Sequence, residues 1–206
     1  MNPFVYPKTR HARRYAPKQY KRYQTYKRIL RLEFFGKCVY CQMPSSMRGY
    51  FSFGADHYRP KKHFPQLMVS YDNLYYCCSA CNSNKGDYWP PGHLLATHFI
   101  PNPCDHVMFA HLRFNGAIVE EKSSAGAIAR EILDLNDPES VSYREFIIGT
   151  VELWQLKRAD LLRKVSKVDK LLRAGTMSTV DADSARNEIH AELVKVDKYL
   201  ALLSGS

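Results

Sequence analysis

Two Cys-x-x-Cys pairs constrain the fold of this chain more than any other feature. The first pair is Cys38-Val-Tyr-Cys41, and the second, Cys78-Ser-Ala-Cys81, follows after 36 intervening residues. Each pair forms a turn that directs two thiolates toward one point, and two such turns complete a tetrahedral Zn²⁺ site. The sequence therefore predicts a structural zinc held by four cysteines, with unligated cysteines as the alternative.

Polar residues that zinc binding does not need lie between and directly after the cysteine pairs. They are Asp56, His57, Asn73 and Asn82. An isolated histidine is more often an ordinary core or surface residue. Here His57 directly follows an acid and lies between two metal-binding turns. This position favours a role in catalysis, since the pKa of a histidine lies near neutrality and suits it to proton transfer.

The positive charge of the chain is concentrated at its start. The net charge is +10, and residues 1–37 contain 11 Lys or Arg side chains and one acid, Glu33. A concentrated positive segment attracts a polyanion by releasing condensed counterions. A solvated basic tail is the alternative. The residues expected to contact nucleic acid in this segment are Arg13, Arg14, Lys21, Arg22, Lys27 and Arg28.

Length and composition suit one domain with an extension, or two small domains. No run of about 18 apolar residues occurs, so neither a transmembrane helix nor a membrane partner is expected. The start of the chain lacks the apolar region of a secretory signal. Cysteines arranged for metal binding fit a reducing compartment, so a cytoplasmic location is the default expectation.

Hydrophobic periodicity predicts an α+β fold. A strand, a loop, a second strand and a helix, with the cysteine turns at their base, form a ββα core, and the last two helices are expected to form an antiparallel hairpin. Three regions are expected: a basic arm and helix (1–36), a core with a following hairpin (37–137) and a helical extension (138–206). The expected elements are an extended segment (1–17), a basic helix (18–35), strands near 49–56 and 67–77, a helix from 81 to about 87, a hairpin (99–122) and helices at 124–135, 139–173 and 181–203. Gly36 is expected to stop the basic helix, and Asn115-Gly116 to form the turn of the hairpin.

These motifs resemble those of HNH endonucleases of the ββα-metal class. The matching segments are CVYC, ADHYRPKK and YDNLYYCCSACNSNKGD, within residues 37–88, about a quarter of the chain. The third motif position holds Asn82, which makes this an H-N-N variant. A looser similarity to HNH proteins of bacterial anti-phage systems, including Septu and retron effectors, rests on Asn102-Pro103, Gly116, Leu133-Asp-Leu-Asn136 and Arg144.

The resemblance implies a role for each motif residue. His57 would be the general base and Asn73 would support its loop. Asp56 and Asn82 would bind a catalytic Mg²⁺ or Mn²⁺ through oxygen atoms, although an asparagine such as Asn82 also suits a helix N-cap. Lys85 would contact a substrate phosphate or be an ordinary exposed lysine. Arg59, Lys61 and Lys62 would be further phosphate contacts.

Three hypotheses about function follow. The first is a metal-dependent HNH endonuclease that hydrolyses phosphodiester bonds of DNA in bacterial defence, with RNA as an alternative substrate. The second is a zinc-dependent nucleic-acid-binding module without catalysis. The third is a nuclease effector that is silent until a partner releases it, with the C-terminal helices docking an ATPase or sensor subunit.

Overall fold

The computed structural model describes residues 2–204, which form a mixed α and β structure, as the sequence predicts. Its first sheet pairs β1 (Phe53–His57) with β2 (Leu74–Cys78) in antiparallel register, so that His57 lies opposite Leu74. The helix α3 (Ser79–Lys85) follows β2 without a loop and packs on both strands. The expected order of strand, loop, strand and helix is therefore present.

The predicted strands at 49–56 and 67–77 and the predicted helix at 81–87 differ from the observed elements at their starts. The first strand begins only at Phe53, because α2 (Ser45–Arg48) and the 3₁₀ turn η2 (Tyr50–Ser52) precede it. The second strand begins only at Leu74, because a 3₁₀ turn at Tyr71–Asn73 precedes it. The helix α3 begins two residues earlier than expected and takes Cys78 as its N-cap. Asn82 therefore lies inside the helix, and its interpretation as an N-cap is wrong.

The predicted basic helix at 18–35 is shorter than expected. Helical structure begins at the 3₁₀ turn η1 (Tyr23–Tyr26) and continues as α1 (Lys27–Glu33). The chain before it is extended, and the hydroxyl of Tyr26 accepts a hydrogen bond from the backbone N–H of Tyr20 at 2.9 Å. In a helix that began at residue 18 the Tyr20 N–H would have no partner within the helix, and here the Tyr26 hydroxyl satisfies it without helical structure. The helix ends at Glu33, earlier than the stop predicted at Gly36, and both Phe35 and Gly36 follow it with a positive φ, of +53° and +68°.

The extended N-terminal segment packs against the core. The backbone N–H of His11 donates to the carbonyl of Pro103 at 2.7 Å, and the Tyr6 hydroxyl donates to the carbonyl of Tyr40 at 2.7 Å. The core that this segment joins is rich in aromatic side chains. Buried members include Phe4, Tyr6, Tyr26, Leu30, Tyr40, Leu74, Tyr75 and Tyr76.

A second hairpin and two short helices follow the first sheet. The Asn-Gly turn predicted from the sequence is present, with Gly116 at a φ of +58°. Gly126 packs so closely on the hairpin that an added Cβ would lie 1.9 Å from the carbonyl oxygen of His111. The elements are α4 (Met108–His111), β3 (Leu112–Asn115), β4 (Ile118–Glu121) and α5 (Ser124–Ile132), and the other 3₁₀ turns are η3 (Pro65–Leu67), η4 (Tyr71–Asn73) and η5 (Gly92–Leu94).

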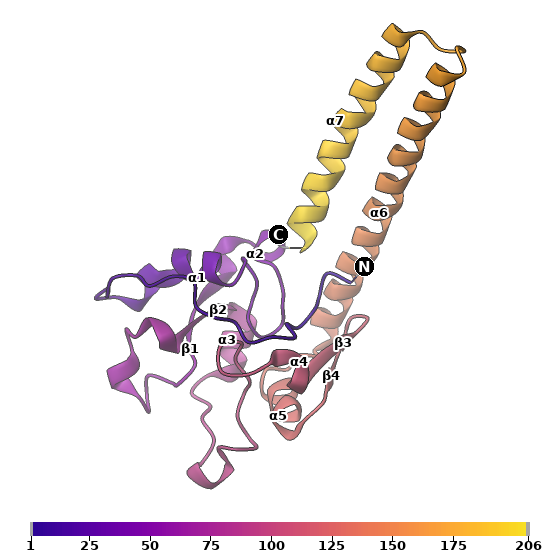
Figure 1. The fold of residues 1–206 in the computed structure, drawn as a ribbon. Coiled ribbons are helices and arrows are strands. Elements are labelled where there is room, and N and C mark those ends of the chain that lie inside the picture. Colours follow the sequence, from indigo (N-terminus) through magenta and orange to yellow (C-terminus); the bar gives the residue numbers. More distant parts are fainter. Residues whose placement is uncertain (1, 205–206) are drawn as a thin grey trace.

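The predicted antiparallel helical hairpin is confirmed. The helices α6 (Pro138–Arg173) and α7 (Thr179–Ser204) lie side by side and project from the rest of the molecule (Figure 1). Asp137 caps α6 by accepting from the backbone N–H of Ser140. The hairpin returns to the core at its base, where the hydroxyl of Ser46 donates to the carbonyl of Leu202 at 2.6 Å.

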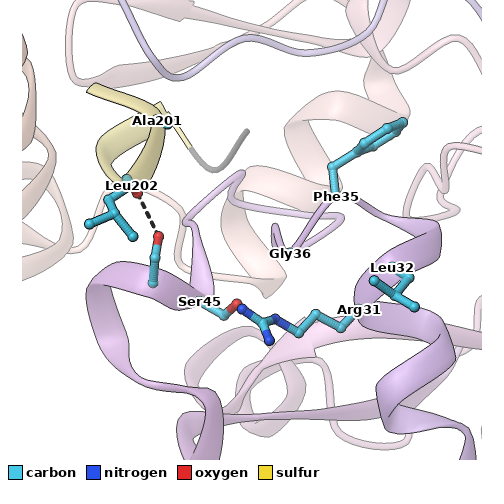
Figure 2. Close-up of a pocket in the computed structure, with 8 residues that line it drawn as sticks. Arg31, Leu32, Phe35, Gly36, Ser45, Ala201 and Leu202 are labelled. Atoms are coloured by element: carbon cyan, nitrogen blue, oxygen red, sulfur yellow. Dashed lines mark hydrogen bonds between the residues drawn. The ribbon is translucent and has the colours of Figure 1, made fainter. Parts of the chain in front are cut away.

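A cleft of about 400 Å³ lies where the end of α7 meets the segment that joins α1 to α2. Figure 2 shows Arg31, Leu32 and Phe35 on one side of this cleft and Leu202 on the other. The side chains of Leu32 and Phe35 are exposed. The base of the helical hairpin therefore meets the N-terminal region that carries the positive charge.

Candidate functional site

The four cysteines of the two Cys-x-x-Cys pairs form one buried cluster. The sulfur atoms of Cys38, Cys41, Cys78 and Cys81 all lie within 4.8 Å of one another. The first pair lies on a tight turn closed by a hydrogen bond from the Gln42 N–H to the Cys38 carbonyl at 3.0 Å. The second pair begins α3, where the N-cap and the first turn of the helix bring two sulfurs together.

This cluster fits a structural zinc ion. Four thiolates about 2.3 Å from one ion form a closed tetrahedral shell that leaves no position for substrate. The Cys41 and Cys78 sulfurs are 3.7 Å apart, as two ligands of one tetrahedral Zn²⁺ are. Cys77 packs within β2 and lies outside the group of four. The four cysteines can therefore hold a metal ion such as zinc.

Asp56 is buried and both of its carboxylate oxygens have partners. The Tyr40 hydroxyl donates to Oδ2 at 2.6 Å, and Lys85 Nζ lies 3.1 Å from Oδ1. Lys85 Nζ also donates to the carbonyl of His57 at 2.7 Å. The helix α3 is thus fixed to β1 at the two motif residues.

Lys85 is itself only 2% exposed. Its interpretation as an ordinary exposed lysine is therefore wrong. A buried ammonium group needs compensating charge and hydrogen bonds, which Asp56 and the His57 carbonyl supply. In this arrangement Lys85 points into the protein toward β1.

His57 lies at the end of β1 and is held on two sides. Its Nε2 atom lies 2.9 Å from the carbonyl oxygen of Met68, and the ring of Tyr23 packs edge-on at 4.6 Å between centroids. Burial lowers the pKa of His57 below its ordinary value, a shift that the nearby Lys61 and Lys85 also favour. The imidazole is therefore neutral at pH 7.

The protonation of His57 follows from its partner. A carbonyl oxygen only accepts hydrogen bonds, so Nε2 carries the hydrogen. Nδ1 is then the unprotonated nitrogen of the neutral ring. This is the state in which a histidine can accept a proton from water.

Asn73 contacts the loop that follows His57, and not His57 itself. Its Oδ1 accepts from the Arg59 N–H at 2.8 Å, and its Nδ2 donates to the Arg59 carbonyl at 3.0 Å. The Asn73 carbonyl also accepts from the Tyr58 N–H at 2.9 Å. Asn73 thus holds Tyr58 and Arg59, the first residues of the loop, against η4.

Asn82 is exposed on α3, one helical turn before Lys85. Its backbone carbonyl accepts from Gly86, which follows the helix. The Asn82 side chain is therefore available on the surface of the helix that also carries the buried Lys85. Its amide oxygen is a suitable ligand for a hard cation.

The predicted phosphate contacts divide into two groups. Arg13 stacks on the rings of Phe34, Tyr71 and Tyr75 and donates to the Leu74 carbonyl at 2.8 Å. Arg14 donates to the carbonyls of Leu32 and Glu33. These two arginines hold the arm on the core. Arg14 is nevertheless exposed at the surface, and the other exposed members of the predicted set are Lys21, Arg22, Arg28, Arg59, Lys61 and Lys62, while Lys27 is half-buried.

Glu33 anchors the N-terminal arm from inside the protein. Its fully buried carboxylate lies 2.6 Å from His11 Nε2 and accepts from the N–H of Arg14 at 3.0 Å and from the Tyr71 hydroxyl at 2.8 Å. Burial alone would raise the pKa of Glu33, but the hydrogen bonds from Arg14, His11 and Tyr71 lower it to about 2. The only acid among residues 1–37 therefore fixes the basic segment in place.

Sequence reasoning missed three residues that surround the motif. Tyr40 bonds Asp56, Tyr23 packs on His57, and Met68 accepts from His57 through its backbone. Tyr40 lies between Cys38 and Cys41, and a Cys-x-x-Cys motif assigns a role only to its two cysteines. A backbone acceptor such as Met68 leaves no signature in the side-chain pattern.

Comparison with known proteins links the chain to one group. It is 25% identical over 114 residues to Septu protein PtuB of Bacillus thuringiensis, an alignment that covers 55% of this chain and 42% of the relative. It is 28% identical over 178 residues to Septu protein PtuB of Bacillus mycoides (strain KBAB4), covering 73% of this chain and 59% of the relative. The chain thus spans about half the length of the curated relatives it matches.

Neither family models nor solved structures add to this similarity, since no family model matches and no solved structure matches. The likeness to Septu proteins agrees with the looser of the two resemblances in the sequence. Within residues 2–204, no helix combines the length and apolar character that crossing a bilayer requires.

Proposed function

We propose that this chain is a metal-dependent HNH endonuclease built on a ββα-metal core. The observation that carries the proposal is the arrangement of His57, whose Nε2 is bound to the Met68 carbonyl and whose Nδ1 is left basic. A pure binding module has no need for a buried, neutral and oriented histidine. In this proposal His57 Nδ1 takes the proton from the attacking water.

Asp56 and Asn82 are the proposed ligands of the catalytic cation. A carboxylate offers about four acceptor positions, so Asp56 can keep its bonds to Tyr40 and Lys85 and still offer a lone pair. Together with the Asn82 amide oxygen this donor set fits Mg²⁺ or Mn²⁺. When bound, such an ion neutralises phosphate charge and stabilises the leaving oxygen. Lys85 keeps Asp56 in position by holding α3 against β1.

The four-cysteine cluster has a structural role in this proposal. Its zinc ion would join the turn at residues 38–41 to the start of α3. Because α3 carries Asn82 and Lys85, loss of zinc would displace both from β1. The structural and catalytic metals are therefore separate sites with different ligand chemistry.

The proposed substrate is DNA, with RNA as the alternative. Exposed cations flank His57 on both sides: Arg59, Lys61 and Lys62 follow it in sequence, and Lys21 and Arg22 adjoin Tyr23, which packs on its ring. Cations spread in this way bind phosphates without reading sequence.

A role in anti-phage defence with a partner subunit is the proposed biological context. The similarity to Septu protein PtuB supports it. The hairpin of α6 and α7 projects from the core and carries exposed apolar residues, including Phe146, Leu153 and Leu156. We assign it to docking an ATPase or sensor subunit that controls cleavage.

One observation favours a second candidate function. The existing bonds of Asp56 to Tyr40 and Lys85 satisfy the carboxylate without a metal ion. A zinc-dependent nucleic-acid-binding module without catalysis would have no need of a further ligand there. Such a module binds in a salt-sensitive manner, and its binding does not depend on His57.

A cleavage panel separates these functions. Purified zinc-loaded protein is incubated with duplex DNA, single-stranded DNA and RNA, each with Mg²⁺, Mn²⁺ or a chelator. The nuclease proposal predicts cleavage of DNA only with a divalent ion. Binding without cleavage under every condition, in the presence of a candidate partner subunit as well, would support the binding module.

A further inference from the structure

Tyr50 and Phe51 form an exposed aromatic pair, and side chains of the helical segment that also contacts His57 lie against it. Phe51 is 95% exposed and its neighbour Tyr50 is 36% exposed. The Tyr50 and Phe51 rings lie 6.0 Å apart at 72° to each other. An aromatic ring this exposed contributes almost nothing to the core, so burial does not explain it.

Two cations of the N-terminal region lie against this pair. Lys27 Nζ is 3.8 Å from the centre of the Tyr50 ring and 5.9 Å from that of Phe51, and the Arg31 guanidinium is 5.6 Å from the Tyr50 ring. Because Phe51 is far more exposed than Tyr50, its ring is the one open to a ligand. Exposed aromatics with adjacent cations are the elements from which proteins build platforms for single nucleic-acid strands.

The same helical segment joins this pair to His57. Tyr23 of η1 packs on the His57 ring, while Lys27 and Arg31 of α1 reach Tyr50. Phe51 and His57 are six residues apart in sequence, at most about 20 Å along an extended chain. A span of about 20 Å corresponds to about six nucleotides along one strand of a duplex, which rises 3.4 Å per nucleotide.

We propose that Phe51 stacks on an unpaired base of the bound nucleic-acid strand, within about six nucleotides of the phosphate at His57. The Lys27 and Arg31 side chains hold the adjacent backbone. This inference rests on the proposed function only in taking a nucleic acid as the ligand. A polyanion is favoured over a protein partner because Lys27 and Arg31, which lie against the aromatic pair, belong to the segment that carries the net positive charge of the chain.

The test uses binding, so that it does not depend on cleavage. The His57→Ala protein and its Phe51→Ala, Phe51→Trp and Phe146→Ala derivatives are titrated with a fluorescent 12-mer of thymidine and a 12-mer of abasic residues with the same charge. Phe146 is the matched control, since it is 64% exposed but lies on α6. Stacking predicts that Phe51→Ala weakens thymidine binding about tenfold and leaves abasic binding unchanged.

Two further results are expected. Phe51→Trp and Phe146→Ala retain the affinity of the parent protein for thymidine. The salt dependence of binding is the same with and without Phe51, because no phosphate contact is lost, whereas Lys27→Gln lowers the slope.

Equal binding of thymidine by the Phe51→Ala and Phe146→Ala proteins would overturn the inference and leave the aromatic pair to a protein partner. An equal loss for thymidine and abasic strands would also overturn it, since stacking needs a base. If the wild-type chain cleaves nothing but Phe51→Ala shows the base-dependent loss, the nuclease proposal fails and the stacking site stands.

Discussion

The Nε2 atom of His57 lies 2.9 Å from the carbonyl oxygen of Met68, and this contact sets which nitrogen of the ring is basic. The next residue, Val69, accepts a hydrogen bond at 3.2 Å from the hydroxyl of Tyr26. Tyr23 packs on the His57 ring itself. The N-terminal arm therefore holds both the histidine and the backbone that orients it.

Removing the Tyr23 ring is expected to lower the cleavage rate. Tyr23→Ala frees the imidazole to rotate away from Met68, and misplacing a catalytic group by about 1 Å can cost about 100-fold. We expect kcat to fall about 10- to 100-fold with little change in KM, and Tyr23→Phe to retain activity. Tyr15→Ala, an exposed tyrosine of the same arm, is the control. Equal activity of the Tyr23→Ala and Tyr15→Ala proteins would contradict a positioning role.

Loss of one cysteine of the cluster is expected to release zinc. Cys78→Ser removes one thiolate ligand and leaves a residue that still suits the N-cap of α3, so one zinc per chain should be lost and the Tm should fall by about 10 °C or more. Cys104→Ser is the matched control, because Cys104 is half-buried and lies outside the cluster. Metal analysis with thermal unfolding measures both. Full zinc content in the Cys78→Ser protein would contradict the four-cysteine site.

The stability of the protein is expected to fall at acidic pH because of Glu33. Its pKa is lowered from 4.5 to about 2 in the folded state. Its contribution to stability is therefore complete above pH 4.5 and is lost as the pH falls toward 2. Glu33→Gln should cost about 3 kcal/mol at pH 7, and the difference from wild type should shrink below pH 4.5. Urea unfolding at pH 7, 5 and 3.5 tests this, and a difference independent of pH would be the contrary result.

The buried Lys85–Asp56 pair is expected to be strongly coupled. Lys85→Met leaves Asp56 as an unpaired buried charge, which costs about 3–5 kcal/mol, whereas Asp56→Asn with Lys85→Met removes both charges and should recover much of that loss. A double-mutant cycle in urea measures the coupling. Additive effects would show that the 3.1 Å contact contributes no stability. Cleavage should be absent from the double variant even where stability recovers, because Asp56 is a proposed metal ligand.

Much of the fold could be predicted because strong local signals agreed with the tertiary structure. The zinc motif fixed residues 38–41 against the start of α3, and the Asn-Gly turn predicted the β3–β4 hairpin. Errors occurred at element starts. The basic helix was predicted from residue 18, but helical structure begins only at Tyr23, and the Tyr20 N–H bonds the Tyr26 hydroxyl. Such a side-chain contact leaves no periodicity in the sequence.

The residues of the candidate site could be predicted from the sequence, but their burial and their contacts could not. The motif indicated Asp56, His57 and Lys85, yet the burial of Lys85 and its bond to Asp56 depend on how α3 docks on β1. Charge patterning likewise identified Arg13 as a surface contact, although its guanidinium lies among three aromatic rings. Sequence patterns show which groups are present, and packing decides which of them face solvent.

The most direct test of the central claim is the cleavage rate of duplex DNA with Mg²⁺ for the wild-type, His57→Ala and His63→Ala proteins. His63 is an exposed histidine of the same loop and serves as the matched control. General-base catalysis by His57 predicts a loss of at least about 100-fold in His57→Ala and wild-type cleavage in His63→Ala. Cleavage by the His57→Ala protein at the wild-type rate would contradict the assignment of His57 as the base.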